Sequence, residues 1–243
     1  SYASAATPNW REKREVDLRK TLIELPGAVD EVAKLEELYN GQFYIGQQAN
    51  ETIFKDCAPK HGILHLAMHG LVDQEDPEYS GLALTEDQSK DEDNFLYAYE
   101  IKQLGLQAGL VVLSACETGI GKYQRGEGVV SIGRGFMYAG APSLLMTLWS
   151  LNDQSGAVII EQFYKNLSKG MEKDEAIRQA KLFYLDNYPP EYTHPFMWAA
   201  FVQVGDYSSI QINHKSNWNY YIAGTVVFLL VLLLLIFKIR KNA

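Results

Sequence analysis

Two short apolar runs in this chain each lead to a reactive side chain with a glycine close behind. The first run, 63–68, leads to His69 and Gly70, and the second, 110–115, leads to Cys116. Apolar runs without polar alternation are typical of strands buried on both faces of a parallel sheet. Because open α/β sheets collect ligands beyond the carboxyl ends of their strands, we expect His69 and Cys116 on one edge of one sheet, close enough to share a proton. The pattern predicts a cysteine-nucleophile site.

The rest of the chain alternates between strand and helix patterns. Val29, Val32, Leu35 and Leu38 recur at helical spacing and predict a helix whose apolar stripe belongs to the core. Further elements are expected as a strand at 81–85, a helix at 129–139, a strand at 143–149, helices at 153–169 and 174–186, and a closing strand at 196–206. This order predicts an α/β fold with a mainly parallel sheet flanked by helices.

Two polar or glycine-rich connections border the expected site. Segment 71–96 is rich in Asp, Glu, Gln and Ser, which predicts a solvated connection that carries only the short strand. Segment 119–128 contains four glycines, which predicts a mobile loop directly after the nucleophile. A nucleotide-binding phosphate loop is disfavoured, because its first glycine would fall on Cys116 and its Ser or Thr on Tyr123.

Charge and cysteine content argue against a nucleic-acid-binding protein and against a disulfide-stabilised one. The formal net charge is −8, and no cluster of Lys and Arg occurs before the C-terminus, so nucleic acid is not expected as the main partner. Cys57 and Cys116 are the only two cysteines, which excludes a disulfide framework. Cys116 is the catalytic candidate and Cys57 is interpreted as incidental. No cofactor is expected.

The C-terminal region predicts a transmembrane helix. Residues 221–237 form an uninterrupted apolar stretch of about 17 residues, which at about 1.5 Å per residue roughly matches the hydrocarbon core of a bilayer. A buried core helix is the alternative, but this stretch is apolar on every face. Aromatic residues precede it and basic residues follow it, as at membrane interfaces: Trp218, Tyr220 and Tyr221, then Lys238, Arg240 and Lys241.

The basic tail favours a cytoplasmic C-terminus, which would put the catalytic domain outside the cytoplasm, on the periplasmic side. That topology requires an export signal that these 243 residues do not contain. A tail-anchored cytosolic enzyme is therefore the alternative.

Four motifs occur in the order and approximate spacing of the CHAT family, and over Leu25–Asp206 the chain resembles a CHAT peptidase domain. The motifs are HLAMHG, LSACETG, GEGVVSIGRGFMYAGAPSLLMTLWSLND and HPFMWAAFVQVGD. The family belongs with caspases, gingipains and separase, which are cysteine endopeptidases with a caspase-like α/β fold, and its members often follow tetratricopeptide repeats. The first residues, SYASAAT, resemble a strand in the middle of many CHAT domains. The resemblance therefore implies that upstream sequence supplies further strands and, by analogy, helical repeats.

The resemblance also implies roles for individual residues. The residues that match His69 and Cys116 are the catalytic dyad of the family, and the backbone N–H groups of Gly70 and Cys116 match the oxyanion hole of caspase-like enzymes. Peptide cleavage needs such a thiolate, a proton carrier and oxyanion donors. His65 and His69 share a face of the expected strand, but no third ligand has the spacing of a zinc site, so His65 is interpreted as structural and no metal is expected.

Two carboxylates have open roles. The segment that ends at Asp153 resembles a separase motif whose acid lines the pocket for a basic side chain at the cleaved position. Asp153 is equally well interpreted as the cap of the following helix, and it can do both. Glu127 is a candidate tether of the glycine-rich loop through Arg125 or Arg134, with surface solvation as the alternative.

Together these features predict a membrane-anchored cysteine endopeptidase, of bacterial type, that cleaves a protein or peptide substrate and is activated by upstream repeats or a partner protein. The alternative is a catalytically silent caspase-like scaffold that relays protein–protein interactions. The expected organisation is the end of an upstream half with a charged connector at 1–23, a catalytic domain at 24–206, a juxtamembrane linker at 207–219, a transmembrane helix at 220–237 and a basic tail at 238–243.

Overall fold

The structure is a computed structural model that describes residues 25–73, 76–86, 92–114, 122–124, 128–130, 132–149, 151, 153–213 and 215. Its centre is a four-stranded sheet with the strand order β1-β5-β8-β9. Three strands are parallel, and β9 pairs antiparallel with β8. The strands are β1 (Ile63–Leu66), β5 (Leu110–Leu113), β8 (Ser143–Thr147) and β9 (Phe201–Gly205). The expected α/β fold with a mainly parallel sheet is confirmed.

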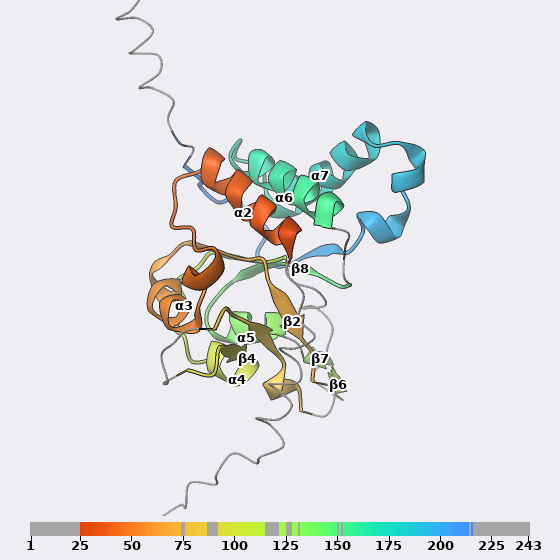
Figure 1. Cartoon of the computed structure of the whole chain (residues 1–243). Coiled ribbons are helices and arrows are strands. Elements are labelled where there is room, and N and C mark those ends of the chain that lie inside the picture. Colours follow the sequence, from red (N-terminus) through yellow and green to blue (C-terminus); the bar gives the residue numbers. More distant parts are fainter. Residues whose placement is uncertain are drawn as a thin grey trace, which may run out of the picture.

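Helices α2, α6 and α7 cover one face of this sheet (Figure 1). Their bounds are Pro26–Leu38 for α2, Asp153–Leu167 for α6 and Lys173–Asn187 for α7. Alternate strand residues, among them Leu110, Val112 and Leu145, point into this layer and are fully buried. The large side chains of α6, such as Phe163, fill the space between the sheet and the helices. Both faces of β5 are buried, because the residues between these point into a second core.

The second core holds Val111, Leu113 and Leu144 of the sheet, together with α5 (Ile132–Tyr138), α4 (Ala98–Ile101) and a small antiparallel sheet. That sheet has the order β2-β3-β4. Its strands are β2 (His69–Leu71), β3 (Gly81–Ala83) and β4 (Phe95–Tyr97). Because β1, β5 and β8 are parallel, their carboxyl ends lie on a common edge of the central sheet.

The remaining elements are short. Helix α3 (Glu51–Cys57) begins at the N-cap Asn50, whose side-chain oxygen accepts the N–H of Ile53 at 2.9 Å. Strands β6 (Lys122–Gln124) and β7 (Gly128–Val130) form an antiparallel pair. Single 3₁₀ turns complete the described chain at Gly46–Gln48, Ala58–Lys60, Pro77–Tyr79, Pro190–Tyr192 and Pro195–Met197.

Three local predictions are wrong. Segment 71–96 is not a simple solvated connection, because it completes β2, carries β3 and leads into β4, and it buries Asp73 and Ser80. Segment 119–128 is not wholly loop, because β6 and the start of β7 lie within it. The helix expected from residue 129 begins at Ile132, since Gly128–Val130 pairs with β6. In each case the difference arises from pairing between short strands.

The apolar stripe expected on the first helix is also wrong at one end. Val29 is 48% exposed, whereas Glu31 is only 5% exposed. Leu35, one turn after Glu31, is the buried apolar residue of α2. The helix is therefore rotated so that Glu31 enters the core, where it contacts the polar side chains of His65 and Ser114.

Within the described residues no helix is both long and apolar enough to cross a membrane. The transmembrane helix expected at 220–237 lies outside the described residues, as do the N-terminal segment 1–23 and the basic tail.

Candidate functional site

The carboxyl edge of the sheet brings together the two strands that lead to the reactive residues. In the parallel pair of β1 and β5, Leu66 is opposite Leu113. The N–H of Ser114 donates to the carbonyl of Leu66 at 2.9 Å, so the pairing continues beyond β5. His69 follows Leu66 by three residues, and Cys116 follows Leu113 by three residues. The two segments therefore leave the sheet at the same level and on neighbouring strands.

His69 does not end β1, as the sequence pattern predicts, but opens β2. Ala67 and Met68 separate the two strands, and His69 is opposite Ala83 in the antiparallel pair of β2 and β3. The chain leaves the parallel sheet here because its next partner, β3, belongs to the smaller sheet. The side chain of His69 is half-buried. The expectation that His69 and Cys116 belong to one sheet is therefore wrong for His69, although the segment that carries it starts from the sheet edge.

Gly70 lies within β2 and is opposite Leu82. Its backbone is part of a regular strand next to His69, at the place where an oxyanion donor was expected. Cys116, the second expected donor and the nucleophile, lies outside the described residues, and so does Glu127. Asp153 is the first residue of α6, and its side chain is not described.

A buried polar cluster lies beside this edge and was not predicted from the sequence. Glu31 of α2 has one carboxylate oxygen, Oε1, 2.7 Å from Nε2 of His65, and the other, Oε2, 3.1 Å from Oγ of Ser114. The second ring nitrogen of His65 is 3.1 Å from the hydroxyl of Tyr164 on α6. His65 is therefore structural in the expected sense, since it links two helices and the sheet. The sequence around Glu31 carries no signal that distinguishes it from the other acids of α2.

A second feature absent from the sequence prediction lies beyond β8. The indole N–H of Trp149 donates to the carbonyl of Phe196 at 2.9 Å, and the two rings stack with centroids 6.0 Å apart. Phe196 is half-exposed, so the pair presents an aromatic surface. This surface lies just after the carboxyl end of β8 and before α6, which begins at Asp153.

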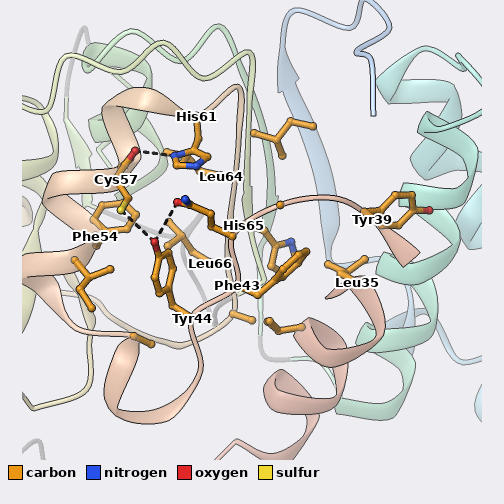
Figure 2. Close-up of a pocket in the computed structure, with 18 of the residues that line it drawn as sticks. Leu35, Tyr39, Phe43, Tyr44, Phe54, Cys57, His61, Leu64, His65 and Leu66 are labelled. Atoms are coloured by element: carbon orange, nitrogen blue, oxygen red, sulfur yellow. Dashed lines mark hydrogen bonds between the residues drawn. The ribbon is translucent and has the colours of Figure 1, made fainter. Parts of the chain in front are cut away.

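A pocket of about 420 Å³ lies on the free side of β1 (Figure 2). Its lining includes the consecutive residues 62–68, together with parts of α2, α3 and the segment that joins them. Cys57 faces this pocket, and its sulfur is 3.3 Å from the hydroxyl of Tyr44. The ring of His61 contacts the carbonyl oxygen of Cys57, at 2.8 Å, and not the sulfur.

Cys57 has no base at its sulfur among these neighbours. The hydrogen bond to Cys57 raises the pKa of Tyr44 above its ordinary value, so the phenol keeps its proton at neutral pH. A protonated phenol cannot accept the proton of a thiol nucleophile. The interpretation of Cys57 as incidental to catalysis agrees with this geometry.

Three carboxylates, of Glu51, Glu92 and Glu100, lie close enough together to hold a cation. The ammonium of Lys55 already lies among them, at 2.7, 2.8 and 2.9 Å. Glu51 is fully buried at the start of α3, and its other oxygen accepts the backbone N–H of Asn94 at 2.8 Å. The cluster therefore joins α3 to the segment before β4 and to α4, and it has an internal cation in place of a metal ion.

This cluster predicts a pH dependence of stability. Burial raises the pKa of Glu51 from about 4.5 to about 7, and the contact with Lys55 lowers it by less. Between these two values the folded chain holds a proton that the unfolded chain has released, so the free energy of unfolding is expected to fall as pH rises from 4.5 to 7. Denaturant titrations across this range should show a flatter curve for Glu51→Gln than for the wild type. Parallel curves for the two proteins would contradict the assignment.

The fold and the register of its strands define the class: an α/β protein with a mainly parallel sheet between two layers, in which β1 and β5 end side by side. The model of the CHAT domain family matches residues 5–206, and the chain belongs to this family. The match begins 20 residues before Leu25, which is the start of the stretch over which the sequence resembles the family. CHAT domains are caspase-like in general.

Two curated relatives match half of the chain. Tetratricopeptide repeat protein 28 of Homo sapiens is 29% identical over 122 residues, which are 50% of this chain and 5% of that protein. The protein of the same name from Mus musculus is 28% identical over 122 residues, with the same coverage. The chain thus spans a small part of the length of these relatives, and the association of this domain with tetratricopeptide repeat proteins is supported.

Proposed function

We propose that this chain is the catalytic part of a membrane-anchored cysteine endopeptidase of the CHAT family, with His69 and Cys116 as its dyad. The observation that carries the proposal is the register of β1 and β5. Leu66 is opposite Leu113, and the two reactive residues each follow three positions later. A thiol and an imidazole delivered from neighbouring strands at the same level suit proton transfer between them.

The reaction follows from these groups. His69 takes the thiol proton of Cys116, and the sulfur attacks the carbonyl carbon of the scissile peptide bond. The backbone N–H groups of Gly70 and Cys116 donate to the oxyanion as it forms. His69 then gives its proton to the leaving amine, the C–N bond breaks, and a thioester remains. Water hydrolyses the thioester, which releases the new carboxylate and restores the thiol.

A thiol-directed peptide probe tests the proposal. A peptide acyloxymethyl ketone should modify Cys116 and leave Cys57 unmodified, as read by mass spectrometry of the digested protein. His69→Ala should suppress the labelling, because the thiolate then lacks its proton acceptor. The assay is run with and without tetratricopeptide-repeat partner proteins, since the family resemblance implies activation from outside the domain. Labelling of Cys57 alone, or equal labelling without His69, would contradict the dyad.

The alternative function is a scaffold without peptidase activity. The relatives named for tetratricopeptide repeats favour it, because such repeats stack into extended surfaces for protein–protein interaction. The scaffold predicts that partner binding survives Cys116→Ala and that no probe labelling appears with any partner. The peptidase predicts partner-dependent labelling, so the same assay separates the two functions.

We expect a preference for Arg or Lys at the cleaved position. Asp153 begins α6, just beyond the edge formed by β5 and β8. A carboxylate there would form a charge-assisted hydrogen bond with a basic side chain, worth about 1.5–3 kcal/mol, which corresponds to a discrimination of about ten- to a hundredfold. A peptide library should show this preference in the wild type and its loss in Asp153→Asn. The matched control is Asp174→Asn, in the first turn of α7, which should keep the wild-type profile. Equal wild-type cleavage after Arg, Leu and Met would contradict the pocket.

We also expect residues 220–237 to anchor the protein in a membrane, with the basic tail in the cytoplasm. The apolar length and the three cations after it support this orientation. A reporter enzyme that works only in the cytoplasm should therefore be active when it is fused after Ala243. A tail accessible only from outside the cytoplasm would overturn the orientation, and full extraction of the protein by alkaline carbonate would overturn the anchor.

A further inference from the structure

Glu31 is a buried acid that reaches both strands of the candidate site. It is 5% exposed and comes from the middle of α2, which crosses the sheet beside α6 (Figure 1). One oxygen lies 2.7 Å from Nε2 of His65 on β1, and the other accepts the hydroxyl of Ser114 at 3.1 Å. Ser114 is two residues before Cys116, and His65 is four residues before His69.

The direction of the hydrogen bonds follows from chemistry. A carboxylate only accepts, so Nε2 of His65 and the hydroxyl of Ser114 both donate to Glu31. In a neutral His65 the other ring nitrogen, Nδ1, is then an acceptor. The hydroxyl of Tyr164, whose oxygen is 3.1 Å away, donates a hydrogen bond to it. Burial and the nearby charge of Glu31 raise the pKa of Tyr164 above its ordinary value, so the phenol remains a donor. The four side chains form one satisfied chain from α6 through β1 and α2 to β5.

Packing alone does not account for this arrangement. Burying an acid and a histidine costs free energy of desolvation, and apolar residues of similar size often stabilise such positions as well or better. What a carboxylate provides and an apolar side chain does not is a fixed distance between two donors on two different strands. Here those donors stand directly before the segments that carry the dyad.

We propose that Glu31 is a positioning residue: it holds the carboxyl end of β5 through Ser114 and that of β1 through His65, and this link controls the reactivity of the Cys116 thiol. This proposal rests on the proposed dyad. It assigns to α2 a role in the site although no residue of that helix belongs to the dyad or the oxyanion hole.

The test measures the reactivity of the Cys116 thiol, which does not require cleavage of any substrate. In a Cys57→Ala background Cys116 is the only cysteine, and its rate of alkylation by iodoacetamide is followed by intact mass. Glu31→Gln keeps the size but cannot accept from both donors. We expect the alkylation rate to fall about tenfold, as for a reacting group displaced from its partner. If peptide cleavage is detected, kcat should fall by a similar factor while KM stays within about twofold.

Ser114→Ala removes a single hydroxyl and should lower the rate in the same direction. The double variant Glu31→Gln, Ser114→Ala should be no slower than the slower single variant, because both changes break the same contact. A general loss of stability would instead add. The matched control is Glu51→Gln, which alters another buried acid that accepts a backbone N–H, in α3, and should leave the alkylation rate unchanged.

Wild-type alkylation rates in folded Glu31→Gln would overturn the proposal. If that variant does not fold, a wild-type rate in Ser114→Ala overturns it in the same way. Slower alkylation in the variants of a protein that cleaves no peptide would support the positioning role and contradict the peptidase. Normal cleavage and normal alkylation in the variants would contradict the positioning role and leave the peptidase intact.

Discussion

Cys116→Ala is expected to lower kcat/KM for peptide cleavage by at least about a thousandfold, because the reaction then has no covalent nucleophile. His69→Ala should cost a similar factor, since a nucleophile and its base act as one unit and their losses do not add. The double variant should therefore be no worse than Cys116→Ala. A fluorogenic peptide series with a basic residue at the cleaved position measures all three proteins.

Two control variants test whether the loss of kcat/KM is specific to the dyad, because each removes another thiol or imidazole. Cys57→Ala removes the other thiol, whose nearest polar partner is the hydroxyl of Tyr44. His61→Gln removes an imidazole whose Nδ1 lies 2.8 Å from the backbone carbonyl oxygen of Cys57. Both variants should keep wild-type kcat/KM within about twofold. Loss of activity in folded Cys57→Ala would move the nucleophile to that residue and refute the assignment of Cys116.

Lys55→Met is expected to lower the free energy of unfolding by about 2–3 kcal/mol at pH 8, between the values typical of exposed and of buried ion pairs. The ammonium of Lys55 lies within 2.9 Å of three carboxylates, and without it those charges repel one another. At pH 5 the loss should be smaller, because Glu51, whose pKa is raised to about 7, is then protonated. Chemical denaturation at the two pH values measures both effects.

The matched control is Lys165→Met. Lys165 pairs with Glu161 one turn earlier on α6 and is 42% exposed, so this pair should contribute less than about 1 kcal/mol. Equal destabilisation by Lys55→Met and Lys165→Met would show that the cluster around Lys55 behaves as an ordinary surface ion pair.

The sequence predicted elements best where burial on two faces left few alternatives. β5 is apolar at every position and lies between two layers, so its pattern and its structure agree at Leu110–Leu113. Helices α6 and α7 begin and end within two residues of their expected bounds, because a polar start and Gly170 mark them locally. Prediction failed where a three-residue segment became a strand only by pairing with another strand, as β2 did with β3 and β6 with β7.

The candidate site divides in the same way. His69 and Cys116 could be picked out as candidates from the sequence, because a base or a nucleophile that follows a buried strand is a local pattern. Glu31 could not be predicted, since nothing near it in the sequence distinguishes it from the exposed acids of the same helix. Its donors, His65 and Ser114, lie 34 and 83 residues away along the chain.

The sequence by itself therefore determined the class of fold and the family, and it supplied the two residues proposed as the dyad, because each depends on short runs of side chains read in order. Tertiary structure alone decided that His69 opens a second sheet, that Lys55 lies among three carboxylates and that α2 turns Glu31 into the core. The physical reason is that hydrogen bonds and ion pairs are satisfied by proximity in space, and the cost of leaving a buried polar group unpaired selects partners wherever the fold brings them.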